Sequence, residues 1–150
     1  MTVEVRHRRS RKSPGPRINT RLLKALATRA LELAGAASHY NLSIVLVNDK
    51  QMAALNARFH HVQGPTDVLS FDYGADEGEL IVSLERVRAQ ARRFRTAPAH
   101  ELALCVSHGI LHLHGYDDRT LRGRRRMRAA ERQWTKHLDR LCLIQGLIAQ

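Results

Sequence analysis

The sequence has little of what several protein classes require. Its two cysteines, Cys105 and Cys142, lie far apart and outside any Cys-x-x-Cys pair, which argues against a disulfide scaffold and against a thiolate zinc knuckle. No stretch approaches the ~18 consecutive apolar residues of a membrane span. The N-terminus also lacks the apolar run and small-residue cleavage site of a secretory signal. We therefore expect a cytoplasmic protein with no membrane partner.

Acidic residues are scarce as well. Asp and Glu number 14 against 25 Lys and Arg, which gives a formal net charge of +11 over 150 residues. A basic balance attracts polyanions, nucleic acid most often and anionic membrane surfaces second, although it also serves solubility alone. The basic side chains gather in residues 1–17 and 119–140, whereas residues 72–85 contain acidic side chains and no basic one. This distribution predicts that the two ends of the chain contact a polyanion.

Hydrophobic periodicity predicts one α+β domain over residues 1–150, with a basic strand and loop at 1–17 and a basic helix at 119–145. The hydrophobic share of 43% is enough for a packed core. The predicted strands are 3–5, 42–47, 67–73 and 80–82, and the predicted helices are 20–36, 49–59, 84–95, 98–115 and 120–145. Because helices and strands are mixed without strict alternation, a small mixed sheet of about four strands with about five helices is favoured over a doubly wound parallel sheet.

The most informative stretch carries His108 and His112 four residues apart on a predicted helix. That spacing places both imidazoles on one face, where they can reach one metal ion. Gly115 can end the helix in a left-handed conformation, so that the chain reverses and returns Asp118 toward the two rings. Two histidines and one carboxylate leave a fourth position for water, which is typical of a catalytic zinc site. The alternative is that both histidines are ordinary, partly buried helix residues.

Two neighbours of this group have different predicted roles. His114 follows His112 by two residues, about 200° around the helix, so it is not expected to be a ligand. Asp117 is a candidate catalytic residue that would orient a ligand or act on bound water.

The residue at position 109 separates two kinds of hydrolase. The zinc-protease motif H-E-x-x-H places a general-base Glu after the first histidine, but that position is Gly109 here. Cleavage of a phosphodiester instead requires a metal ion and cations that neutralise charge on the phosphoryl oxygens. This chain has the cations and lacks the Glu, which favours a phosphodiester substrate over a peptide.

Residues 55–60 read LNARFH, residues 65–71 read PTDVLSF and residues 108–118 read HGILHLHGYDD. These segments resemble the patterns L-N-x-x-Y-R, P-T-D-V-L-S-F and H-G-x-L-H-L-x-G-Y-D-H of the YbeY family of bacterial endoribonucleases. Residues 78–83 are similar to the family's G-D-x-x-I-S strand, and Met127 and Glu131 match its Met-x-x-x-Glu. The resemblance spans about residues 42–140.

This resemblance implies an α+β fold with a zinc ion held by three histidines. It implies metal-dependent cleavage of single-stranded RNA, chiefly in maturation of the 3′ end of small-subunit (16S) ribosomal RNA and in ribosome quality control. It also implies contact with the small ribosomal subunit. Two positions depart from the family pattern: the third histidine is Asp118 here, and the arginine that acts near the RNA falls on His60.

The leading hypothesis is a zinc-dependent endoribonuclease that binds one ion per chain. The predicted metal ligands are His108, His112 and Asp118, the predicted catalytic residues are His60 and Asp117, and the predicted RNA contacts are Arg58, Arg124, Arg125 and Arg126. A non-catalytic RNA-binding factor in ribosome assembly is the alternative, motivated by Asp118 and His60. A small metallopeptidase is a third interpretation, and the oligomeric state is left open.

Overall fold

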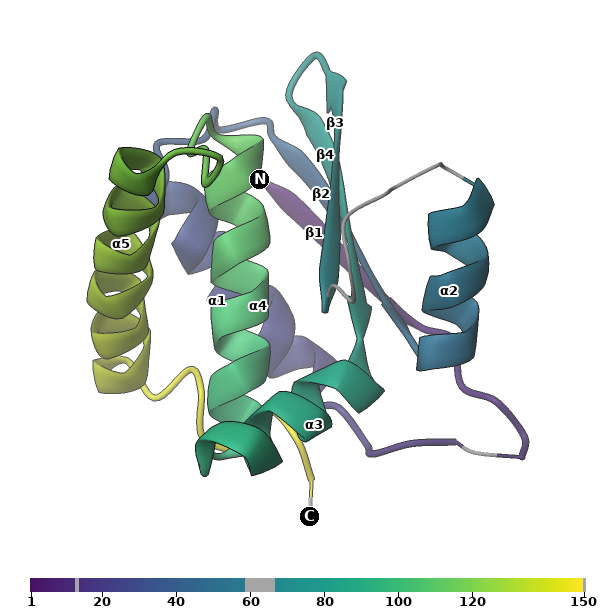
Figure 1. Ribbon diagram of the computed structural model, residues 1–150. Helices are drawn as coiled ribbons and strands as arrows, with labels where there is room; N and C mark the ends of the chain where they lie inside the picture. The colour runs from purple at the N-terminus through teal and green to yellow at the C-terminus, as the bar shows by residue number, and fades with distance from the viewer. Residues whose placement is uncertain (13, 59–66, 150) are drawn as a thin grey trace.

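The chain folds into helices and strands in the order that its hydrophobic pattern predicts. The computed structural model describes residues 1–12, 14–58 and 67–149. Within these residues the elements are β1 (Thr2–His7), α1 (Thr20–Leu33), β2 (Asn41–Val47), α2 (Asp49–Arg58), β3 (Val68–Gly74), β4 (Glu77–Ser83), α3 (Leu84–Phe94), α4 (Pro98–Leu113) and α5 (Leu121–Arg140). The predicted four strands and five helices are confirmed for the described residues, and the fold class is α+β (Figure 1). None of the described helices combines the length and the apolar composition needed to cross a bilayer.

The four described strands form one mixed sheet in the order β1-β2-β4-β3. β1, β2 and β4 run parallel, and β3 pairs antiparallel with β4 through a two-residue turn with positive φ values. β4 begins at Glu77, earlier than the predicted strand 80–82. Its acidic residues alternate with buried Gly78 and Leu80, so this part of the chain has the alternating pattern of a strand. Glu77 and Glu79 therefore belong to a β-hairpin, and not to a loop between the predicted strands 67–73 and 80–82.

Helices lie against both faces of the sheet. In β2, alternate residues from Leu42 to Leu46 are buried in a large core with α1 and α4. Val45 and Val47 face the other way, into a smaller apolar cluster with Met52 of α2. Figure 1 shows α2 across the sheet from α1, α4 and α5. The unbroken apolar run of β2 follows from this arrangement, because a strand that is buried on both faces needs no polar alternation.

α4 approaches the sheet closely at Gly109. A Cβ atom at this position would lie 2.6 Å from Leu80 Cδ2 and 3.2 Å from Ser70 Oγ. Leu80 is fully buried, so it has little space into which to move. Glycine therefore sets the distance between α4 and the sheet. The same contact leaves no room for the Glu of the zinc-protease motif unless the core is displaced.

The last helix is shorter than predicted. α5 ends at Arg140 and not at residue 145, because Cys142 adopts a left-handed φ of 59° and turns the chain back. The apolar residues that follow return to the core, where Ile148 forms an isolated β-bridge with Ile18. In the sequence, the apolar residues after Arg140 continue the helical pattern of α5. In the structure, they reach the core from a non-helical segment.

Gly109→Ala tests the close approach of α4 to the sheet. Helix propensity and overpacking change the free energy of unfolding in opposite directions. Helix propensity alone would stabilise the protein by about 1 kcal/mol. Overpacking against Leu80 is expected to dominate and to lower the free energy of unfolding by about 1–3 kcal/mol. Chemical denaturation of both proteins measures the difference.

The control is the same substitution in a Leu80→Ala background, where the added methyl group has space. Gly109→Ala is expected to cost less there than in the wild-type protein. A gain in stability from Gly109→Ala alone would show that the contact does not constrain the helix.

Candidate metal centre

Three side chains converge near the C-terminal end of α4. Nε2 of His108 lies 3.1 Å from Nε2 of His112. Oδ2 of Asp118 lies 3.9 Å from the first of these nitrogens and 3.5 Å from the second. Their candidate donor atoms all lie within 4.8 Å of one another, and the described residues contain no second group of this kind. The predicted return of Asp118 toward the two imidazoles is confirmed.

The spacing of these atoms fits a single metal ion. Donor atoms around a tetrahedral ion with bonds of ~2.0–2.1 Å lie roughly 3.4 Å apart. The three distances here, 3.1, 3.5 and 3.9 Å, bracket that value. The side chains of His108, His112 and Asp118 are 30%, 29% and 40% exposed. A bound ion would therefore remain open to solvent and substrate, as in a catalytic site.

Glu131 of α5 supports the first histidine from behind. Nδ1 of His108 donates to Oε1 of Glu131 at 2.6 Å. Burial by itself would lower the pKa of His108, but the hydrogen bond to Glu131 and the charge of that carboxylate outweigh it and leave the pKa raised. A carboxylate on Nδ1 fixes the tautomer in which Nε2 presents its lone pair to a metal. Glu131 is therefore a positioning residue. The sequence analysis matches it to the Met-x-x-x-Glu pattern but does not predict this role.

The turn between α4 and α5 places Asp118. Gly115 has a φ of +92°, and the amide of Tyr116 returns to the carbonyl of Leu111 at 3.0 Å. This is the left-handed helix end predicted from the sequence. Nη1 of Arg124 then donates to the backbone carbonyl of Asp118 at 3.3 Å. Asp118 is thus held between the end of one helix and the first turn of the next.

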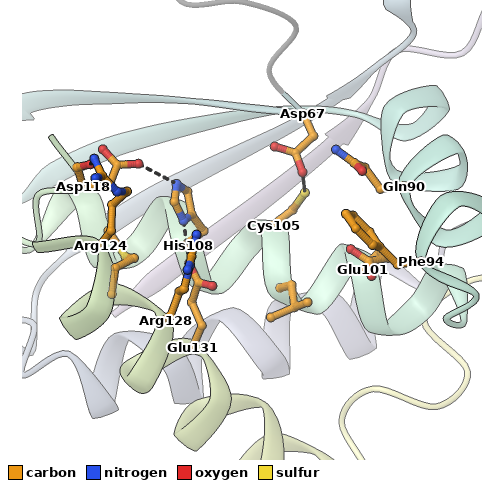
Figure 2. Close-up of a pocket in the computed structure, with 12 residues that line it drawn as sticks. Asp67, Gln90, Phe94, Glu101, Cys105, His108, Asp118, Arg124, Arg128 and Glu131 are labelled. Atoms are coloured by element: carbon orange, nitrogen blue, oxygen red, sulfur yellow. Dashed lines mark hydrogen bonds and ion pairs between the residues drawn. The ribbon is translucent and has the colours of Figure 1, made fainter. Parts of the chain in front are cut away.

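Two hollows flank the three ligands and share His108 and Asp118. One, of about 570 Å³, lies between β3 and the turn after α4 and is called the β3 arm. The other, of about 340 Å³, is lined by α3, α4 and α5 and is called the α5 arm (Figure 2). Together they form a cleft with the candidate metal centre at its middle.

Asp117 faces the β3 arm but is engaged by an arginine. Nε of Arg119 donates to Oδ2 of Asp117 at 2.9 Å, and Nη2 lies 2.8 Å from the same oxygen. These hydrogen bonds lower the pKa of Asp117, which makes it a weaker proton acceptor. Its catalytic role stays a prediction. His114 points elsewhere, since its Nδ1 bonds to the carbonyl of Ile110 at 2.8 Å.

The predicted RNA contacts fall at different places around the cleft. Arg124 lines the α5 arm, and Arg126 stacks on Tyr116 of the β3 arm, 4.6 Å from its ring centroid. Arg125 is exposed on α5 and lines neither arm. Arg128, which the sequence reasoning missed, joins Arg124 in the α5 arm because the two are one helical turn apart.

The structure describes only one of the two remaining predicted residues, Arg58 and His60. Arg58 is the last residue of α2, across the sheet from α4, and is not among the described residues that line either arm. His60 lies outside the described residues. The roles of both stay predictions.

A buried contact ties the start of β3 to α4. Sγ of Cys105 donates to Oδ2 of Asp67 at 2.8 Å. Burial first, and then the carboxylate of Asp67, raise the pKa of the Cys105 thiol well above its ordinary value. The thiol therefore stays protonated and serves as a donor, not as a nucleophile or metal ligand.

Comparison with known proteins agrees with this architecture. A family model described as endoribonuclease YbeY matches residues 7–139. Proteins named endoribonuclease YbeY from Symbiobacterium thermophilum and Heliobacterium modesticaldum are 38% and 33% identical, over 72% and 76% of this chain and 79% and 86% of theirs. A solution structure of a Thermotoga maritima protein is similar at a TM-score of 0.63 and 25% identity, covering 91% of this chain and 89% of that chain. The matched region begins earlier than the resemblance at 42–140 indicates.

Glu131→Gln is expected to weaken metal binding without abolishing it. The amide keeps the shape of the side chain but removes the charge that holds the imidazole of His108. Loss of such a supporting carboxylate typically costs 10–100-fold in metal affinity. Competition with a metal-sensitive chelator, together with elemental analysis, measures the affinity and the number of ions per chain.

Two variants bracket this result. His108→Ala is expected to lose the ion outright, whereas Glu85→Gln, an exposed residue of α3, is expected to bind as the wild type does. Wild-type affinity in Glu131→Gln would remove Glu131 from the site.

Proposed function

Because the chain belongs to the YbeY endoribonuclease family, we propose that it is a metal-dependent endoribonuclease that cleaves single-stranded RNA. The observation that carries this proposal is the placement of the three candidate ligands between two open arms. A strand lying along both arms would pass its backbone over the metal centre. That geometry suits an internal cut and requires no chain end.

Different residues would position the metal ligands and neutralise the charge of the RNA. Glu131 holds the His108 ring so that Nε2 faces the other two ligands. The exposed guanidinium groups of Arg124 and Arg128 would neutralise phosphates at the edge of the α5 arm. Arg119, held by Asp117, carries charge at the β3 arm. When an ion is bound, it supplies Lewis acidity that polarises a phosphoryl oxygen and makes water a stronger nucleophile at neutral pH.

We propose zinc as the ion, with one ion per chain. Two imidazole nitrogens and one carboxylate oxygen suit zinc in a catalytic site. Iron(II) is the other ion that commonly takes this donor set, so elemental analysis of the purified protein distinguishes them.

The finer role follows the family resemblance. We propose that the substrate is the 3′ end of 16S ribosomal RNA, processed in the cytoplasm in contact with the small ribosomal subunit, and that the protein takes part in ribosome quality control. The family match and the basic face of α5 support an RNA partner of this kind. His60 remains the proposed catalytic residue that contacts RNA, and Arg58 a proposed RNA contact outside the described arms.

Asp118 supports one competing function. The family pattern has histidine at this position, and a carboxylate adds negative charge that makes water at the centre less acidic. A non-catalytic RNA-binding assembly factor is therefore the alternative. The metallopeptidase interpretation is disfavoured because Gly109, packed against Leu80, leaves no room for a general-base Glu.

Cleavage of a labelled single-stranded RNA separates these functions. We expect internal cuts that stop when EDTA removes the metal and return when zinc is restored, with little cleavage of a DNA strand of the same sequence. His112→Ala should lose the activity, and His114→Ala, outside the ligand group, should keep it. Asp118→His, which restores the family ligand, should retain cleavage.

The outcomes are distinct. RNA binding without chelator-sensitive cleavage would favour the assembly factor and overturn the nuclease. Chelator-sensitive turnover of peptides would instead revive the peptidase.

The arginines of α5 are expected to bind RNA through phosphates. Reversal of charge at Arg124, Arg125 and Arg126 should weaken binding and reduce the slope of log K against log salt by about 0.7 for each lost phosphate contact on a single strand. Fluorescence anisotropy at several salt concentrations measures this slope. Metal content should change little, because Arg124 contacts the backbone carbonyl of Asp118 and not its carboxylate.

A matched reversal of three exposed cations outside both arms, Arg21, Lys24 and Lys50, provides the control for net charge. Equal effects in the two triple variants would mean that α5 contributes only overall charge.

A further inference from the structure

We propose that the α5 arm is a base-recognition subsite, in which one nucleobase of the RNA stacks on Phe94 and is read by Gln90 and the carboxylates at the floor of the arm. The subsite would prefer a base with an exocyclic amino group, adenine or cytosine, over uracil. This inference rests on the proposed RNA substrate and adds a specificity that the family match does not contain.

The arm has the size and position for a base. Its volume of about 340 Å³ falls in the range of ~300–1,000 Å³ that is typical of small-ligand sites. His108 and Asp118 lie at one end of it, and Phe94 and Gln90 at the other (Figure 2). Figure 2 shows Gln90 and Phe94 reaching from α3 toward Asp67 and Glu101, with His108 on the far side of Cys105. A nucleotide whose phosphate lies at the metal centre would therefore extend its base toward α3.

The charges in the arm favour a base over a phosphate. Besides the candidate ligand Asp118, three carboxylates line it, those of Asp67, Glu101 and Glu131. Their recorded partners are the Cys105 thiol, the Thr96 hydroxyl and the His108 imidazole, respectively, and they do not form a metal-ligating group. The lining cations are Arg124 and Arg128, both exposed on α5. Carboxylates repel phosphate and accept hydrogen bonds, so the floor suits the N–H donors of a base edge.

Phe94 and Gln90 form one working face of α3. They are four residues apart, which places both side chains on the same side of the helix. Phe94 is 58% exposed, although large apolar side chains are usually buried. Its ring is accompanied by the Arg93 guanidinium, 5.3 Å from the centroid. An exposed ring beside a cation is the kind of platform on which single-stranded nucleic acids stack.

Gln90 supplies the polar group that such a platform needs for discrimination. Its Oε1 is buried and has no hydrogen-bond partner among the described residues. Buried polar atoms are normally paired, and Gln90 lines the arm. Rotation of its side chain toward the arm would therefore bring Oε1 to an amino group of a ligand and satisfy it. Cytosine presents an amino group where uracil presents a carbonyl oxygen. The amide oxygen and the carboxylates would accept hydrogen bonds from the amino group of cytosine and would repel the carbonyl oxygen of uracil.

The experiment uses the metal-loaded protein and a series of nine-nucleotide RNAs. Each contains a single cytidine at one position in an otherwise all-uridine strand. Affinity and cleavage are measured for every position. We expect one register in which cytidine binds about tenfold more tightly than uridine, the scale of a single well-placed base contact. Adenosine at that position should also be preferred.

Two variants assign the preference to the arm. Phe94→Ala is expected to weaken binding of every RNA by about tenfold, because it removes the stacking platform. Gln90→Ala should retain binding but bring the cytidine-to-uridine ratio close to one. Tyr73→Ala and Gln133→Ala are the controls, since both residues are exposed and lie outside the arm, and both should behave as the wild type.

Circular dichroism and metal analysis check that each variant is folded and binds its metal ion. If Phe94→Ala does not fold, Phe94→Leu takes its place. Chelator-sensitive cleavage with no base preference, or with a preference that Gln90→Ala retains, would overturn the subsite while leaving the nuclease intact. A base preference in binding without cleavage would overturn the nuclease while leaving the subsite intact.

Discussion

The contact between Gly109 and Leu80 determines where the rest of the centre lies. α4 carries two of the three candidate ligands, and its distance from the sheet is set by the missing Cβ. Because Leu80 belongs to the buried face of β4, the sheet in effect locates both imidazoles. A rigid, close-packed support of this kind holds ligands more accurately than a loop does.

The third ligand and the supporting carboxylate come from the other side. Asp118 is placed by the turn into α5, and Glu131 by the second half of that helix. The centre therefore depends on how α4 and α5 pack against each other as much as on α4 itself. In the α5 arm, Glu101 and Glu131 are largely buried, whereas Arg124 and Arg128 are exposed at the edge. Opposite charges are therefore also separated within the cleft, and not only between the middle of the sequence and its ends.

Much of this arrangement can be predicted from the sequence, because it depends on local spacing. The His108–His112 pair, the turn at Gly115 and the order of elements follow from helical and strand periodicity. Glu131 could not be assigned as a support from spacing alone, because its contact with His108 bridges two helices whose packing the sequence does not display. The early end of α5 was missed for a similar reason. Apolar residues after Arg140 continue a helical pattern, and only the tertiary core explains why they leave it.

The tail after α5 has a consequence for how the molecule is assembled. The bridge between Ile18 and Ile148, and the hydrogen bond from the amide of Ala149 to the carbonyl of Arg17, join segments from nearly opposite ends of the chain. Contacts of such high sequence separation carry a large loop-closure entropy and slow folding. The core beside α1 is thus completed by the residues that follow α5, and a chain truncated after Arg140 would lose these contacts.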